Sequence, residues 1–123
     1  MKFFVYTFLF CFSVFSCNRK TSAEISATVP GIPVCIQRKI DSIKQHPVWN
    51  PPAEIDEYLY AGRKVCVISA RCCDLFSIAV DENCNYLCAP SGGFTGKGDR
   101  KCVDFSEKAK FIRLIWKDER KGK

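Results

Sequence analysis

The stretch from Cys88 to Cys102, CAPSGGFTGKGDRKC, comes nearest to a chemical motif in this chain, because it has the composition of a phosphate-binding loop. Such a loop needs a glycine, four residues, Gly-Lys and then Ser or Thr. Its backbone amides surround the phosphates and its hydroxyl holds magnesium. The spacing from Gly92 to Gly96 is one residue short, and Gly98 stands where the hydroxyl is required. No parallel βαβ pattern surrounds the stretch, so the sequence argues against a nucleotide site.

The same glycines leave two other interpretations open. Glycine adopts positive φ easily, and successive amides can then point into a concavity that binds an anion, with basic side chains close by. The alternative is a rigid loop held between two stapled cysteines. The residues for binding an anion or a partner are Gly92, Gly93, Thr95, Gly96, Lys97, Gly98, Arg100 and Lys101.

Metal and nucleophile patterns are incomplete elsewhere. The run 81–85 matches the opening of a calcium loop, but Tyr86 and Gly92 stand where glycine and a carboxylate are needed, which favours a hairpin turn. Four cysteines that could hold zinc lack C-x-x-C spacing: Cys72, Cys73, Cys84 and Cys88. Cys73 could act as a nucleophile only if His46, the one histidine, lay beside it. We therefore predict no metal, no cofactor and no catalytic residue.

The N-terminal end predicts export. Lys2 is followed by thirteen uncharged residues, 3–15, which is shorter than the ~20 residues of a membrane-spanning helix but typical of a secretory signal. Val14-Phe15-Ser16-Cys17 resembles a lipobox, in which the cysteine is acylated. We expect residues 1–16 to be a lipoprotein signal peptide and Cys17 to carry lipid. An ordinary signal peptide cut near Ser22, or an uncleaved anchor, are the alternatives.

Export changes how the cysteines are interpreted. Of nine cysteines, Cys11 would be removed with the signal peptide and the thiol of Cys17 would be blocked by lipid, so 9 − 2 = 7 remain. In an oxidising compartment they would form disulfides, each worth ~2–4 kcal/mol, and an odd number leaves at least one thiol without a partner in the chain. Vicinal cysteines close only a strained ring, so we expect these two to reach separate partners. The candidates are Cys35, Cys66, Cys72, Cys73, Cys84, Cys88 and Cys102.

Charge is concentrated at the C-terminal end. Residues 17–96 carry eight basic and eight acidic side chains, whereas residues 97–123 carry ten and five, a net charge of 10 − 5 = +5. This end either contacts anionic headgroups or polyanions, or is a solvated face. We expect no nucleic-acid partner.

The pattern of elements predicts a small α+β domain over residues 33–120. Residues 17–32 have no period and predict a flexible tether. Pro33 and the isoleucines at 36, 40 and 43 predict an amphipathic helix that ends by Pro47. Alternating segments predict hairpins of 54–60 with 64–70 and of 76–80 with 85–89, then a strand over 111–117. Asp104 and Glu107 have the spacing of a capping box before a short helix, 105–110. The fold is thus an N-terminal helix, an antiparallel sheet of about five strands, a short second helix and disulfides, with a basic tail at 121–123.

The chain resembles a family of small bacterial envelope proteins of unknown function, mostly from Bacteroidota. The resemblance covers residues 33–120, and its most specific parts are Cys72-Cys73-Asp74, Gly92-Gly93-Phe94-Thr95-Gly96-Lys97-Gly98-Asp99 and Cys102. It implies a lipoprotein or secreted single domain and no assigned reaction. It also implies tyrosine and glycine where this chain has Cys66 and Cys84, so these two are a candidate extra disulfide that offsets a positive φ at Cys84.

Two functions follow as expectations. The first is a non-enzymatic, lipid-anchored envelope protein that binds or inhibits an unknown protein or anionic ligand through the loops at 72–73 and 92–99. The second is a thiol-based oxidoreductase or another small envelope enzyme that uses the odd cysteine. Asn18-Arg19-Lys20 lacks the acidic run associated with surface export, which favours the outer membrane, facing the periplasm.

Overall fold

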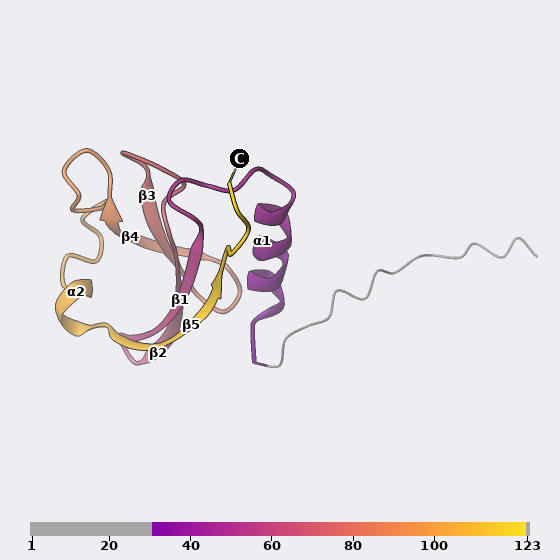
Figure 1. The fold of residues 1–123 in the computed structure, drawn as a ribbon. Helices are drawn as coiled ribbons and strands as arrows, with labels where there is room; N and C mark the ends of the chain where they lie inside the picture. The colour runs from indigo at the N-terminus through magenta and orange to yellow at the C-terminus, as the bar shows by residue number, and fades with distance from the viewer. Residues whose placement is uncertain (1–30, 123) are drawn as a thin grey trace, which may run out of the picture.

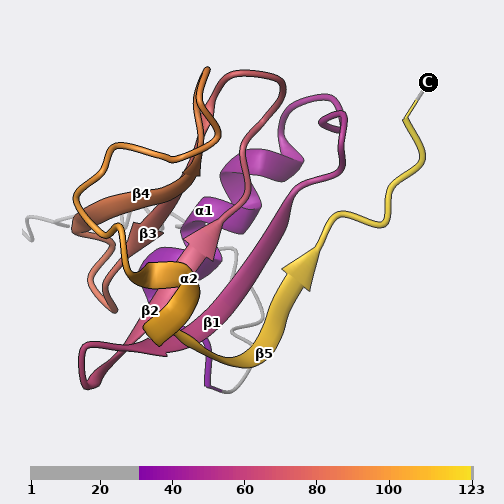
Figure 2. The same cartoon turned by 90° about the vertical axis from the view of Figure 1, so that its left-hand side faces the viewer.

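The computed structural model describes residues 31–122, so the predicted signal peptide, Cys17 and all but the end of the predicted tether lie outside the described residues (Figure 1). One helix lies against one face of an antiparallel sheet, and a short second helix lies on the other side (Figures 1 and 2). The predicted α+β class is confirmed. In chain order the elements are α1 (Val34–Lys44), β1 (Glu54–Tyr60), β2 (Arg63–Ile68), β3 (Phe76–Val80), β4 (Tyr86–Gly92), α2 (Phe105–Lys108) and β5 (Lys110–Lys117).

The sheet has the strand order β4-β3-β2-β1-β5, and every neighbouring pair is antiparallel. β1 and β2 are joined by the two residues Ala61 and Gly62, both with positive φ (50° and 76°), the backbone that suits a tight hairpin. β5 returns along the outer side of β1, with two shifts of register that indicate β-bulges. Bulges on an edge strand hinder pairing with a second sheet.

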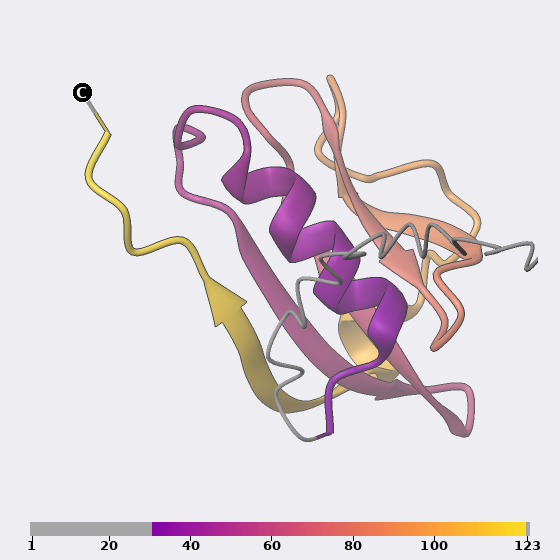
Figure 3. The ribbon, with the colours of Figure 1, turned by 90° about the vertical axis from the view of Figure 1, so that its right-hand side faces the viewer.

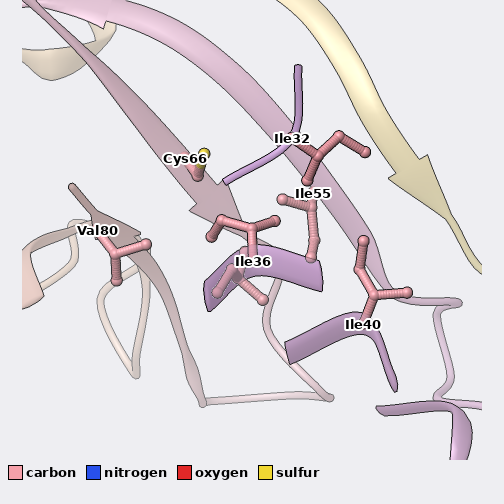
Figure 4. Packing of buried hydrophobic residues seen from close by; sticks show 7 residues of the cluster. Ile32, Ile36, Ile40, Ile55, Cys66 and Val80 are labelled. Atoms are coloured by element: carbon pink, nitrogen blue, oxygen red, sulfur yellow. The ribbon is translucent and has the colours of Figure 1, made fainter. Parts of the chain in front are cut away.

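The larger core lies between α1 and the sheet. Ile36, Ile40 and Ile43 of α1 are all buried, as their spacing predicts, and α1 lies over the sheet, roughly along the direction of β1 (Figure 3). Ile55 of β1 and Cys66 of β2 meet the helix from the sheet, and Val80 of β3 closes the cluster (Figure 4). No described helix is both long enough and apolar enough to cross a membrane.

The smaller core lies on the opposite face, beneath α2. The ring of Phe105 packs against Tyr58 and Tyr60 of β1, with ring centroids 5.4 and 4.8 Å apart. Asp104 precedes the helix as predicted, but its side chain caps no amide. It accepts hydrogen bonds from Tyr60 Oη (2.6 Å) and Lys108 Nζ (2.9 Å) instead. The prediction of a capping box is therefore wrong, because the Asp104 carboxylate links α2 to Tyr60 of β1 and caps no amide.

Two buried carboxylates are each paired with an arginine. Glu57 Oε2 of β1 accepts from Arg113 Nε of β5 at 2.8 Å, and Arg113 Nη2 also donates to the Gly31 carbonyl. Asp118 accepts from Arg120, and this hydrogen bond lowers the pKa of Asp118 below its ordinary value. Arg120 also donates to the carbonyls of Lys44 and His46, so it satisfies the C-terminal end of α1.

Two disulfides close the fold. Cys35 at the start of α1 is bonded to Cys84 in the β3–β4 turn, and Cys88 of β4 is bonded to Cys102. Cys84 has the expected positive φ (63°). The expected disulfide between Cys66 and Cys84 is wrong, because Cys84 is bonded to Cys35. Cys66 points from β2 into the core beneath α1, whereas the turn places Cys84 beside Cys35.

The other three described cysteines are free. Cys66 is buried, Cys72 is half-buried and Cys73 is exposed. Within residues 31–122 neither Cys72 nor Cys73 is bonded to another cysteine, so the separate disulfide partners expected for them are not found there. The prediction of at least one free thiol is confirmed.

Candidate functional site

The two loops singled out in the sequence lie side by side at one end of the sheet. The Cys72–Cys73 segment leads into β3, and the glycine-rich stretch leaves β4, the strand next to β3. The amide of Gly93 donates to the carbonyl of Leu75 (3.3 Å), and the ring of Phe76 occupies the space where a Cβ on Gly93 would stand. The loops therefore form one continuous surface.

The glycine-rich loop uses its amides internally. Gly96 donates to the carbonyl of Gly93 (3.0 Å), Gly98 to that of Gly92 (3.0 Å) and Asp99 to that of Ala89 (3.1 Å). The amide of Lys101 donates to the Asp99 carboxylate at 3.0 Å. Because these donors are occupied, the loop does not present them as a nest for an anion.

The loop instead covers the free edge of β4. Its return places Gly98 and Asp99 along Ala89, so edge carbonyls of β4 that would face solvent accept hydrogen bonds. Gly98 has φ +62°, and a Cβ there would overlap the carbonyl oxygen of Ala89 and lie 2.7 Å from its carbon. Glycine is therefore a steric requirement at this position. The disulfide from Cys88 to Cys102 closes the base of the loop.

Some side chains of the loop are held by contacts with neighbouring side chains, and others are exposed to solvent. Lys101 lies 5.0 Å from the ring centre of Tyr86 and 3.9 Å from Asp99, whose carboxylate accepts from Tyr86 Oη. Lys97 and Arg100 are exposed, and no described residue pairs with either. Phe94 at the loop tip is 94 % exposed, the largest value among the exposed apolar side chains of the described residues.

Two of the free thiols, Cys66 and Cys73, are poorly suited to nucleophilic chemistry. Burial, with a smaller contribution from Glu57, raises the pKa of Cys66 to about 11. The pKa of Cys73 is raised by its hydrogen bond with Cys72 and by the charge of Asp74. Reactive thiols have lowered pKa values, so these directions do not favour the oxidoreductase alternative. No hydrogen bond or ion pair joins His46 to Cys73 in residues 31–122.

Alkylation of the native protein tests this assignment. With iodoacetamide at pH 8, we expect Cys73 to be modified slowly, because a thiolate must form and its pKa is raised. Cys66 should be protected because it is buried. The modification rate at Cys73 should rise with pH through and above pH 9. Mass spectrometry of peptides after timed quenching measures it. Rapid modification at pH 6 would show a reactive, low-pKa thiol and revive the enzyme alternative.

A family model described as a domain of unknown function, DUF6970, matches residues 41–118, which is more than half of the chain. The chain belongs to this family. The matched region of the DUF6970 domain begins within α1 and ends just after β5, so it includes both loops. It leaves out residues 1–40, where the lipoprotein signal is predicted. No curated protein and no solved structure shows significant similarity to the chain.

The DUF6970 domain also has features that the sequence did not single out. One is the exposure of Phe94: the residue lies inside the glycine-rich motif, but nothing in its type predicts that it is exposed, since phenylalanine is usually buried. Another is a pocket beside the Cys72–Cys73 segment, formed by residues of α1, β2, β3 and the segments that connect them, which no local pattern links. The alternation of apolar residues signals only that each strand has one buried face.

Proposed function

We propose that this DUF6970 protein is a lipid-anchored, non-enzymatic binding protein of the cell envelope. Its lipid is attached at Cys17, and it faces the periplasm from the outer membrane. Its partner is a protein, bound by the surface that the Cys72–Cys73 segment and the Gly92–Asp99 loop form together. The composition of the N-terminal segment supports the anchor, and the geometry of the loops supports binding.

Phe94 is the observation that carries the binding proposal. A large apolar side chain is exposed at the tip of a loop whose backbone is fixed by hydrogen bonds and a disulfide. A rigid loop loses little conformational entropy on binding, so more of the contact energy contributes to affinity. Aromatic residues are enriched in the cores of protein interfaces. The free cations Lys97 and Arg100 follow Phe94 in the stretch between Cys88 and Cys102, which favours a partner with an apolar pocket and an acidic rim.

Site-specific crosslinking tests the binding surface. A photoreactive phenylalanine analogue at position 94 of the full chain should give one discrete adduct with an envelope protein. The control carries the same analogue at Val34, which is 58 % exposed on α1, at the side of the sheet away from the loop. Excess unlabelled wild-type protein should suppress the adduct, whereas excess Phe94→Ala protein should suppress it about tenfold less. Equal adducts from positions 94 and 34, or none from 94, would refute the proposal.

Mass spectrometry of the mature protein tests the anchor separately. We expect the chain to begin at Cys17 and to carry the added mass of acyl groups, and Cys17→Ser to abolish that mass. An unmodified chain that begins at any other residue would contradict lipid attachment. The binding surface does not depend on this outcome, because it lies within residues 72–99.

A further inference from the structure

A pocket of about 380 Å³ lies where the C-terminal half of α1 meets β2, β3 and the segment that carries the vicinal cysteines. It is distinct from the loop tip at Phe94 and does not depend on the proposed function. Small-molecule sites have volumes of ≈300–1,000 Å³, so this pocket has room for a small ligand but not for a folded partner. Its principal lining residues are Lys39, Ile43, His46, Trp49, Arg71 and Phe76.

The floor and walls of the pocket are apolar. Ile43 of α1 and Ile68 of β2 are buried beneath it, and Ile78 of β3 extends the same surface. Leu75 and Phe76 form one wall although they are 52 % and 47 % exposed. Two large apolar side chains beside an apolar floor are a surface that gains free energy when a ligand removes it from water.

The rim of the pocket carries the cations Lys39 and Arg71, beside the imidazole of His46, and no carboxylate lines it. Within residues 31–122, neither Lys39 nor Arg71 forms an ion pair, whereas other lysines and arginines, such as Arg113 and Arg120, do. The partial negative charge at the end of α1 is offset because Arg120 donates to the carbonyls of Lys44 and His46. An anion at the rim would therefore meet unpaired positive charge.

We propose that this pocket binds a single-chain fatty carboxylate of medium length. Its tail lies on the isoleucines and against Trp49 and Phe76, and its carboxylate lies at the rim near Arg71 and Lys39. The guanidinium of Arg71 can donate two parallel hydrogen bonds to a carboxylate. The volume selects one short acyl chain over a two-chain lipid. Affinity should increase about fourfold for each methylene that enters the pocket, until the volume is filled.

The emission of Trp49 provides a local measurement. The chain has two tryptophans, and Trp116→Phe leaves Trp49 as the reporter. In the full chain with this substitution, decanoate below its micellar concentration should change the emission saturably. Decyltrimethylammonium, with a similar tail and the opposite charge, should bind at least tenfold more weakly. Arg71→Gln and Lys39→Gln should each weaken decanoate binding about tenfold and leave binding of the neutral decanol unchanged.

A second measurement avoids the tryptophan substitution. In ¹H–¹⁵N spectra of the wild-type protein, decanoate should shift the amides of Ser69, Arg71 and Phe76 and leave those of Thr95 and Lys97 unchanged. Phe94→Ala should leave decanoate binding intact, which separates this site from the protein-binding surface. Equal binding of the anionic and cationic amphiphiles, insensitivity to both rim substitutions, or shifts confined to residues 94–97 would overturn the proposal.

Discussion

Gly98→Ala should destabilise the domain by about 4 kcal/mol or more, a magnitude that single substitutions reach only through a specific clash or loss. The methyl group would overlap the carbonyl oxygen of Ala89, and backbone atoms cannot move aside as a flexible side chain can. Relief of the overlap requires the loop to leave β4, which breaks the hydrogen bonds from Gly98 to Gly92 and from Asp99 to Ala89. The positive φ adds its own cost.

Gly96→Ala is the matched control for this prediction. Gly96 has a similar φ (+71°) in the same loop, but a Cβ there would meet no atom within 4 Å. Gly96→Ala should therefore destabilise the domain only through the strain of a positive φ, by about 1–2 kcal/mol. Urea unfolding followed by circular dichroism measures both variants. If the two substitutions cost the same, the loop does not pack on the edge of β4 as described.

Removing the Cys35–Cys84 disulfide should cost about 4 kcal/mol, and removing Cys88–Cys102 about 3 kcal/mol. The chain-entropy model gives these values because the first bridge spans 49 residues and the second spans 14. The paired serine variants, Cys35→Ser with Cys84→Ser and Cys88→Ser with Cys102→Ser, test the order by urea unfolding. The control is Cys73→Ser, which removes an exposed free thiol and should change the free energy of unfolding by less than about 0.5 kcal/mol. Cys66→Ser is unsuitable as a control because it buries a hydroxyl in the core.

The turn residue at position 84 allows a finer test of the first bridge. Cys84 has φ +63°, a backbone that glycine adopts without strain. Cys35→Ser with Cys84→Gly should therefore be about 1 kcal/mol more stable than Cys35→Ser with Cys84→Ser. The reverse order would show that the turn changes its backbone once the bridge is removed.

The local elements of the fold could be predicted because each has its own apolar period. The isoleucines at 36, 40 and 43 define the buried face of α1, and alternation defines the two hairpins. The place of β5 beside β1 could not be predicted, because it depends on pairing between distant segments. Phe105 and Asp104 fix that connection through Tyr58 and Tyr60, which only the folded chain brings together.

The candidate site was predictable in part. The sequence identified the glycine loop and its flanking cysteines. It did not show that the loop covers the edge of β4, where its amides donate hydrogen bonds to carbonyls of that strand. The pairing of Cys66 with Cys84 was wrong because sequence spacing gives no direction for a side chain, and Cys66 alternates into the core. Arg71, Lys39 and Trp49 meet in one pocket only through the tertiary arrangement of α1 against the sheet.

The positions of the two disulfides also determine how the domain responds to mechanical force. A pull applied across residues 33–118 reaches Cys35 after two residues and passes through the bridge to Cys84, so α1, β1, β2 and β3 carry no tension. The tension then passes through the second bridge, from Cys88 to Cys102, so the glycine loop between these cysteines carries none. Only residues 33–34, 85–87 and 103–118 can lengthen, and β5, the edge strand, is the element that peels away. With both bridges closed, the domain is a short, nearly inextensible link, and reduction of the first bridge releases most of its length.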